Sequence, residues 1–283
     1  MLGALIIVFR EVIEAGLIVG IVMAVTGGVR GSRMLVVLGV VAGLIGASLV
    51  AAFAGAIGEA LQGIGQELFN ASILIIAVVM LTWHNVWMAR HGRELAAQVK
   101  QVGEQVRSGA RPIYALGVVV AVAVMREGSE VALFLYGLVA SSNSTSWDLI
   151  AGSLLGLALG GAVTAVTYLG LVTIPPRRLF AVTTLLITFL AAGLAAQAAL
   201  FLQQAGVATV LSQTAWDTSG VLSDTSLFGR VLHTLIGYSD QPSVLQVVVY
   251  LVTLATIFAL TKAFAPRPPV FRTRTHEIRS KSV

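Results

Sequence analysis

Two short motifs combine arginine and glutamate within otherwise apolar segments of the chain. Residues 10–14 read Arg-Glu-Val-Ile-Glu and residues 126–130 read Arg-Glu-Gly-Ser-Glu, so both follow the pattern Arg-Glu-x-x-Glu. At about 100° per residue on an α-helix, the second Glu falls between the Arg and the first Glu, and each motif therefore forms one polar face. Carboxylates in such an arrangement bind cations or exchange protons, and the arginines hold them together when no cation is present.

The charges of the two motifs do not balance. Four carboxylates against two guanidinium groups leave a net charge of −2 when all are ionised. Placing one ionisable group at mid-membrane costs about 2.5–3.5 kcal/mol, and a surplus of negative charge in a low dielectric is destabilising without a cation. We therefore expect a mid-membrane cation site between the two motif helices. Its metal ligands would be Glu11, Glu14, Glu127 and Glu130, with Arg10 and Arg126 supporting them.

The ligand atoms offered by the motifs narrow the choice of cation. Both motifs supply carboxylate oxygens and neither contains a thiol or an imidazole. Oxygen-only sites favour hard cations over copper or thiolate-bound zinc, so Fe³⁺, Mg²⁺, Mn²⁺ and Ca²⁺ are all compatible. A purely structural Arg–Glu clamp is the alternative, but a clamp would balance its charges more closely.

Long apolar segments must position these groups. The chain has 283 residues, of which 57% are hydrophobic and 11% charged, whereas soluble proteins have about 25% charged residues. Seven apolar runs are long enough to cross a bilayer, and they do not alternate as the strands of a membrane barrel do. We therefore predict an all-α integral membrane protein with seven transmembrane helices. The runs cover about 2–27, 35–57, 69–89, 112–139, 149–173, 179–203 and 245–265.

Basic residues cluster on alternate connections, which predicts the orientation. Fifteen of the 18 Lys and Arg residues lie at 28–34, 90–111, 174–178 and 262–283, and Arg230 is on the opposite side. The positive-inside rule makes the basic side cytoplasmic, so we expect the N-terminus outside and the C-terminus in the cytoplasm. Apolar residues at helical spacing predict an amphipathic helix at 90–111, lying against the cytoplasmic membrane surface, and another within the long outer loop.

The two motifs fall in the first and fourth spans, which run in opposite directions. Spans one to three and four to six therefore resemble two inverted-topology repeats with a seventh helix appended, a design that places a substrate site at mid-membrane. We expect a seven-span domain at 1–265 and a basic cytoplasmic tail at 266–283. Within the domain, repeat one covers about 1–111, repeat two about 112–203, the outer loop 204–244 and helix seven 245–265.

Several residues outside the motifs are candidates for guiding a cation. Glu59 and Glu67 flank a short outer connection, and Asp217 and Asp224 lie in the long outer loop. Acids at these places could gather cations at an outer entrance, although solvated loop acids and helix caps have the same sequence pattern. His84, towards the cytoplasmic end of the third span, is a candidate exit ligand, with a position in the interfacial aromatic belt as the alternative.

Several classes of protein are excluded or not expected. The chain has no cysteine, which rules out disulfides and thiolate metal sites. The net charge of +5 is mostly the topology signal, so we expect no nucleic-acid partner. The sequence contains no phosphate-cradling glycine loop and no His-Glu-x-x-His zinc motif, so ATP hydrolysis and metalloprotease chemistry are not expected. We also expect no cleavable signal sequence, because no basic region precedes the first apolar run.

The duplicated motif in the first and fourth of seven spans, with the N-terminus outside, resembles the oxidase-dependent ferric iron permease family of fungi and bacteria. The likeness covers residues 1–265. The family motif is Arg-Glu-Gly-Leu-Glu; this chain keeps Gly128 but has Ser129, and it has Val12 and Ile13 in the first copy. The charged positions are intact, so these departures concern packing more than ligation.

The resemblance implies import of Fe³⁺ across the plasma or inner membrane, with the motif glutamates binding iron. It implies iron as the substrate, no permanently bound cofactor and no enzymatic activity. Membrane lipids are expected partners, and an extracytoplasmic oxidase or iron-binding protein and a homo-oligomer are candidate partners. Three alternatives stay open: a permease for Pb²⁺, Mn²⁺ or Fe²⁺, an intramembrane enzyme that uses paired carboxylates for acid–base chemistry, and a structural subunit whose charges pair with another chain.

Overall fold

A computed structural model describes residues 1–60, 65–141, 146–170, 176–224 and 226–264. These residues form eight α-helices and no β-strand, apart from an isolated bridge between Thr214 and Ser243. The predicted all-helical class is therefore confirmed. The helices are α1 (Leu2–Val25), α2 (Ser32–Ala60), α3 (Gln66–Arg107), α4 (Tyr114–Ser141), α5 (Ser146–Tyr168), α6 (Pro176–Gln204), α7 (Leu227–Ile236) and α8 (Val244–Phe264).

Five helices of the described chain are long and apolar enough to cross a membrane. The two motif helices, α1 and α4, have comparable lengths of 24 and 28 residues, but each carries one Arg and two Glu within its central turns. These features are those of an integral membrane protein, while the number of spans and their orientation stay predictions. The five apolar segments are Ser32–Ala56, Gln66–Met88, Ser146–Tyr168, Ala181–Gln204 and Val244–Phe264.

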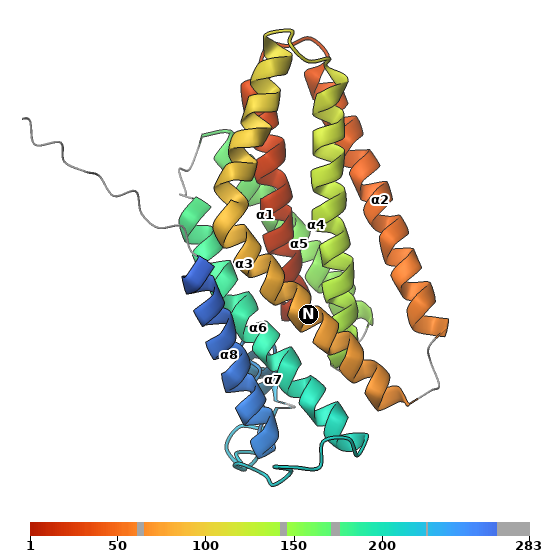
Figure 1. Cartoon of the computed structure of the whole chain (residues 1–283), viewed down its shortest axis with the longest axis vertical. Coiled ribbons are helices and arrows are strands. Elements are labelled where there is room, and N and C mark those ends of the chain that lie inside the picture. The colour runs from red at the N-terminus through yellow and green to blue at the C-terminus, as the bar shows by residue number, and fades with distance from the viewer. Residues whose placement is uncertain (61–64, 142–145, 171–175, 225, 265–283) are drawn as a thin grey trace, which may run out of the picture.

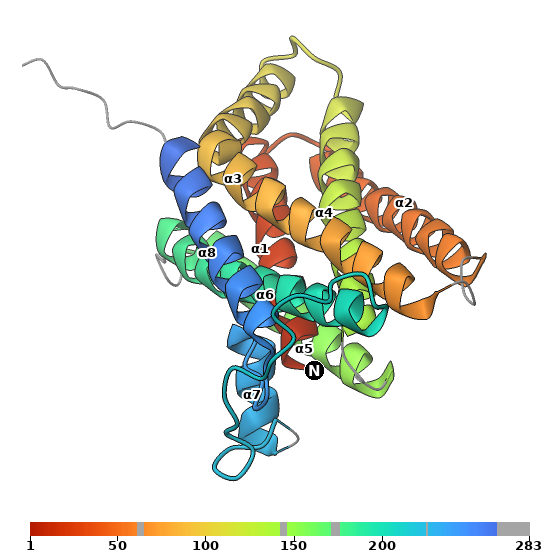
Figure 2. The same ribbon diagram turned by 60° about the horizontal axis from the view of Figure 1, so that its bottom comes forward.

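The two motif helices lie next to each other at the centre of the bundle. α5 packs along α1 and α2 packs along α4, while α3 crosses this central pair and also contacts α6 (Figure 1). α8 lies at the edge of the bundle against α6 and α3 (Figure 2). Neighbouring helices therefore enclose α1 and α4, and the polar faces of their motifs meet inside protein.

Glycine allows the outer helices to approach the central pair closely. A methyl group added to Gly156 of α5 would lie 2.6 Å from the carbonyl oxygen of Leu5 in α1, and one added to Gly43 of α2 would lie 2.7 Å from that of Ala121 in α4. Small residues at such contacts are typical of helices that associate within a membrane. Leu5 and Ala121 are 116 positions apart, as are the two motifs, so α5 packs on α1 in the same way as α2 packs on α4.

α3 is longer than one span and continues far beyond its apolar segment. It has 42 residues, changes direction about midway, and its second half runs beside α1 and α4 (Figure 1). On this second half, Val99 and Val106 are buried in a cluster with Val22 of α1 and Leu116 of α4. The prediction of a separate helix lying on the membrane at 90–111 is therefore wrong, because these residues continue α3 to Arg107 and cover protein rather than lipid.

The connection between α6 and α8 contains the second amphipathic helix expected from the sequence. This helix, α7, begins after Ser226, whose hydroxyl accepts a hydrogen bond from the Gly229 N–H at 2.9 Å. It ends at Gly237, which has a left-handed φ of 70°, a conformation that glycine adopts at little cost. The Tyr238 hydroxyl, which donates to the Leu222 carbonyl at 2.7 Å, then ties the connection together.

Candidate metal site

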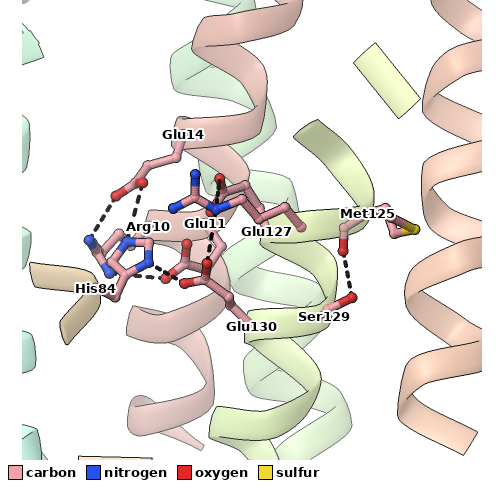
Figure 3. Close-up of polar contacts among 9 residues, drawn as sticks. Arg10, Glu11, Glu14, His84, Met125, Glu127, Ser129 and Glu130 are labelled. Atoms are coloured by element: carbon pink, nitrogen blue, oxygen red, sulfur yellow. Dashed lines mark hydrogen bonds and ion pairs between the residues drawn. The ribbon is translucent and has the colours of Figure 1, made fainter. Parts of the chain in front are cut away.

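The first motif forms a tightly paired group on α1. Arg10 Nη1 donates to Glu11 Oε1 at 3.0 Å, and Nη2 lies 2.9 Å from Glu14 Oε1 (Figure 3). The Arg10 side chain is only 2% exposed, and both glutamates are buried as well. A buried charge is tolerated only when it is paired and hydrogen-bonded, so Arg10 offsets part of the negative charge on its own helix.

The second motif, on α4, has the same sequence pattern but looser pairing. Arg126 Nε lies 3.2 Å from Glu130 Oε1 and 3.8 Å from Glu127 Oε1. Its guanidinium also lies over the indole ring of Trp87 on α3, 4.2 Å from the ring centroid. The Arg126 side chain is 34% exposed. Arg10 is thus committed to its carboxylates, whereas Arg126 is shared between carboxylates and an aromatic ring.

His84 lies between the two motifs. Its Nε2 is 3.4 Å from Glu14 Oε2, and its Nδ1 contacts Glu130 Oε2 (Figure 3). The sequence suggests an exit ligand or an interfacial belt residue, but His84 is only 4% exposed and lies at the centre of the bundle. The reason is that α3 crosses the α1–α4 pair and continues well beyond the apolar span, so that His84 is far from the end of the helix.

Four side chains from three helices converge on one point. Each of Glu11, His84, Glu127 and Glu130 offers one ligand atom, and these atoms all lie within 4.8 Å of one another. Three carboxylate oxygens and one imidazole nitrogen form a ligand set that suits iron, manganese or zinc. Glu14, the fourth glutamate of the motifs, contacts this group through His84 and is itself paired with Arg10.

Two of the carboxylates present free oxygens inside the protein. Glu11 Oε2 and Glu127 Oε2 are buried and have no hydrogen-bond partner within the described part of the chain. Buried polar atoms are nearly always paired, and leaving one unpaired costs about 1–3 kcal/mol or more when the group is charged. Oxygens in this condition are chemically suited to accept a cation, which would satisfy them together.

Two neighbours of the cluster were not identified from sequence. The side chain of Asn85 is buried, and neither of its amide atoms has a hydrogen-bond partner among the residues that the structure describes. The sequence does set His84 and Asn85 apart, because they are two adjacent polar residues inside an apolar span. Trp87 gave no such signal, because its contact with Arg126 depends on how α3 crosses α4.

The acids proposed for an outer entrance lie apart from the central cluster. Glu67 is exposed in the first turn of α3, and Asp224 is half-buried in the α6–α8 connection. Asp217 is exposed, and its carboxylate accepts hydrogen bonds from the N–H and hydroxyl of Ser219 at 3.0 and 2.6 Å, which lowers the pKa of Asp217. Glu59 is in the last turn of α2, and its side chain lies outside the described part of the structure.

The fold and the site together define a class: a multi-pass helical membrane protein whose buried charges are gathered between two central helices. Residues 1–266 match the model of the iron permease FTR1 family. The chain therefore belongs to this family, which confirms the resemblance carried by the duplicated motif, and it is a multi-pass protein of the inner membrane with iron as the transported substrate.

Curated relatives of the chain are also named as iron permeases. The chain is 34% identical over 266 residues to the ferrous iron permease EfeU of Shigella sonnei (strain Ss046), a match that covers 90% of this chain and 94% of the relative. The EfeU of Escherichia coli O157:H7 gives the same values. The EfeU of Shigella flexneri is 38% identical over 200 residues, covering 69% of this chain and 84% of the relative. No solved structure matches the chain.

Proposed function

We propose that this chain imports ferric iron and that the ion passes through the cluster between α1, α3 and α4. The observation that carries this proposal is the convergence of four buried ligand atoms, from Glu11, His84, Glu127 and Glu130, within 4.8 Å of one another. A cluster of this kind in a member of an iron permease family is best explained as the place where the substrate leaves water and is bound by protein. All four ligands come from one chain, so the site needs no second copy.

The composition of the ligand set supports the ferric form. Carboxylate oxygens outnumber nitrogen by three to one in the cluster, and such hard, charged ligands suit a small, highly charged cation. The proposed extracytoplasmic partner is then an oxidase or an iron-binding protein that supplies Fe³⁺ at the outer face.

Fe²⁺ is the second candidate, and two observations favour it. The relatives are named ferrous iron permeases. In addition, four carboxylates and two guanidinium groups leave a charge of −2 when His84 is neutral, and this charge balances a divalent ion. Uptake into proteoliposomes under controlled redox conditions distinguishes Fe³⁺ from Fe²⁺ as the substrate.

The orientation that we propose places the N-terminus outside and the C-terminus in the cytoplasm. The α1–α2 and α3–α4 connections, which carry Arg30 and Arg111, lie at one end of the bundle with the first turn of α2, which carries Arg33. The α6–α8 connection lies at the other end (Figure 1). The positive-inside rule assigns the first end to the cytoplasm. α1 and α4 then cross the membrane in opposite directions as the central helices of two inverted repeats, and the matching contacts of Gly43 and Gly156 support this relationship.

Uptake of radioactive iron into proteoliposomes tests the proposal. We expect Glu127→Gln to lower uptake of ⁵⁵Fe by at least about tenfold. The variant removes a liganding carboxylate, and each 1.4 kcal/mol of lost binding free energy lowers the affinity about tenfold. Glu104→Gln is the matched control, since it makes the same change at an exposed acid of α3 that belongs to neither the cluster nor the candidate entrance, and it should keep uptake. Unchanged uptake in Glu127→Gln, with the protein present in the vesicles, would contradict the site.

The same vesicles separate the two oxidation states. Uptake from Fe³⁺-citrate under oxidising conditions, with little uptake from Fe²⁺ held reduced by ascorbate, is the result expected for a ferric permease. The opposite preference would assign the ferrous form to this chain.

A further inference from the structure

We infer that the site contains two overlapping positions for the ion and that His84 is a ligand in both. This inference rests on the proposed function and orientation. The outer position consists of Glu130, Glu11, Glu127 and His84. The inner position consists of Glu14, Glu11, Glu127 and His84. In the structure the ligands of the outer position converge, whereas Glu14, which completes the inner position, is held by Arg10.

The antiparallel course of α1 and α4 separates the two positions along the membrane normal. Glu14 lies three residues, or about 4.5 Å at 1.5 Å per residue, further towards the cytoplasm than Glu11. Because α4 runs the other way, Glu130 lies about as much further outwards than Glu127. Figure 3 shows Glu14 and Glu130 on opposite sides of the level of the other two glutamates. An ion that moves from Glu130 to Glu14 therefore moves inwards.

His84 reaches both ends of this short path. Its two ring nitrogens face different carboxylates, Nε2 towards Glu14 and Nδ1 towards Glu130. Within the described part of the chain, His84 is the side chain that contacts both Glu14 and Glu130, the last glutamates of the two motifs. An imidazole here can stay near the ion while one terminal carboxylate is exchanged for the other, so the ion need not lose several ligands at once in a low-dielectric environment.

The two arginines differ in a way that selects one position. Arg10 contacts both carboxylates of its motif at 3.0 Å or less. Glu14 has one oxygen on Arg10 and the other facing His84, whereas Glu11 keeps Oε2 without a hydrogen-bond partner among the described residues. Arg126 lies over Trp87, donates to Glu130 Oε1 at 3.2 Å and lies 3.8 Å from Glu127 Oε1. An arginine competes with a metal ion for the same oxygens. The outer terminal glutamate is thus the more accessible of the two: its side chain is 15% exposed against 2% for Glu14, and its arginine lies at the longer distance.

Transfer of the ion follows from exchanging these two states. Arg126 would give up Trp87 for a closer pairing with Glu130, and Arg10 would release Glu14, so that the ion passes to the inner position. The two motifs have the same pattern of Arg and Glu, 116 positions apart. The arrangement after transfer, in which Arg126 holds Glu130 and the ion is bound by Glu14, therefore resembles the arrangement before transfer with the two repeats interchanged. This is the exchange expected between inverted repeats that alternate access to a central site.

The matched pair Glu14→Gln and Glu130→Gln tests the two positions. Each variant removes one negative charge from the same cluster by the same substitution, and both should abolish uptake of ⁵⁵Fe into proteoliposomes. Equilibrium dialysis of the purified proteins against ⁵⁵Fe, as Fe³⁺-citrate and as ascorbate-reduced Fe²⁺, should separate them. We expect the affinity to fall at least about tenfold more in Glu130→Gln than in Glu14→Gln. Glu130→Gln removes a direct ligand of the outer position and Glu14→Gln does not, and a contact worth about 1.4 kcal/mol changes the affinity tenfold. Equal losses, or a larger loss in Glu14→Gln, would overturn the inference.

The role of His84 has its own readout. Iron K-edge X-ray absorption of the loaded wild-type protein should show scattering from an imidazole ring, and so should loaded Glu14→Gln. His84→Ala, checked for membrane insertion and a monodisperse elution profile, should lose this signal and most of its uptake. An unchanged spectrum in His84→Ala would remove His84 from the ligand set. If the wild-type protein neither binds nor transports iron, the proposed function itself fails, whereas normal iron uptake with equal binding in the glutamate pair overturns the two positions alone.

Discussion

The guanidinium carbon of Arg126 lies 4.2 Å from the centroid of the Trp87 ring. This contact joins the second motif, on α4, to the helix that also supplies His84. Arg10, the equivalent residue of the first motif, is instead paired with two carboxylates on its own helix. One aromatic side chain on α3 thus distinguishes two motifs that have the same charged residues.

Replacing Trp87 should weaken iron binding. In Trp87→Leu the cation–π contact, worth about 0.5–2 kcal/mol, is lost, and Arg126, which already donates to Glu130 at 3.2 Å, is free to pair more closely with it. The affinity for iron in equilibrium dialysis should then fall by about 2- to 30-fold. The control is Trp83→Leu, since Trp83 is 71% exposed on the same helix. The same affinity in both variants would show that the Trp87 ring does not hold Arg126 away from the ligands.

The two arginines should contribute differently to stability. Arg10→Gln leaves Glu11 and Glu14 buried without their cation, and breaking a buried ion pair in this way costs about 3–5 kcal/mol. Arg126→Gln should cost about 1 kcal/mol or less, because the side chain is partly exposed and its contacts are longer. Thermal unfolding in detergent should therefore give a much lower midpoint for Arg10→Gln. A larger drop for Arg126→Gln would contradict this order.

The glycine contacts make a prediction about helix packing. Gly156→Ala and Gly43→Ala should each destabilise the protein by about 1–3 kcal/mol, the usual cost of overpacking, because the added methyl groups meet backbone oxygens of α1 and α4. Gly161→Ala is the control, since no atom within 4 Å would meet its methyl group. Unfolding midpoints in detergent should fall for the first two variants. A comparable fall in Gly161→Ala would show that contact with the α1 and α4 backbones does not explain the effect, because Gly→Ala by itself favours the helix.

Asp217 offers a test of the α6–α8 connection through pH. The hydrogen bonds from Ser219 favour the carboxylate, so the folded pKa of Asp217 is lower than its unfolded value. Their contribution to the turn is therefore complete above the unfolded pKa, about 3.9, and is lost as the pH falls through the lower folded pKa. Ser219→Ala should raise the pKa of Asp217.

The pKa of Asp217 can be measured because the chain contains few aspartates. The chain contains four Asp residues, so the carboxyl carbons can be followed by NMR after selective ¹³C labelling. One midpoint should rise in Ser219→Ala while the other three stay unchanged. Uptake of iron in Asp217→Asn should stay within about twofold of wild type if the residue caps a turn, whereas a large loss would support the outer entrance suggested by the sequence.

Much of the helical framework follows from sequence, because the bilayer imposes simple rules. A lipid environment requires every backbone polar group to be paired within the segment, so long apolar runs such as 35–57 and 245–265 must be helices. The charged residues of the motifs must face protein for a similar reason, since burying charge in lipid is costly. Residues 90–111 could not be placed from sequence, because their apolar stripe suits either lipid or protein. Contact with α1 and α4 decided that residues 90–107 extend α3.

By itself, the sequence determined that Arg10, Glu11 and Glu14, with their copies on the second motif helix, had to face protein together, because charge in an apolar span has few other solutions. Only the tertiary structure decided which of these groups meet and what joins them. His84, which the sequence offered as a candidate exit ligand or a belt residue, lies between Glu14 and Glu130 because α3 crosses the motif helices. The crossing also set Trp87 against Arg126, which made two identical charge patterns unequal. Local sequence records which side chains are polar, but the distances between helices come from packing over the whole bundle.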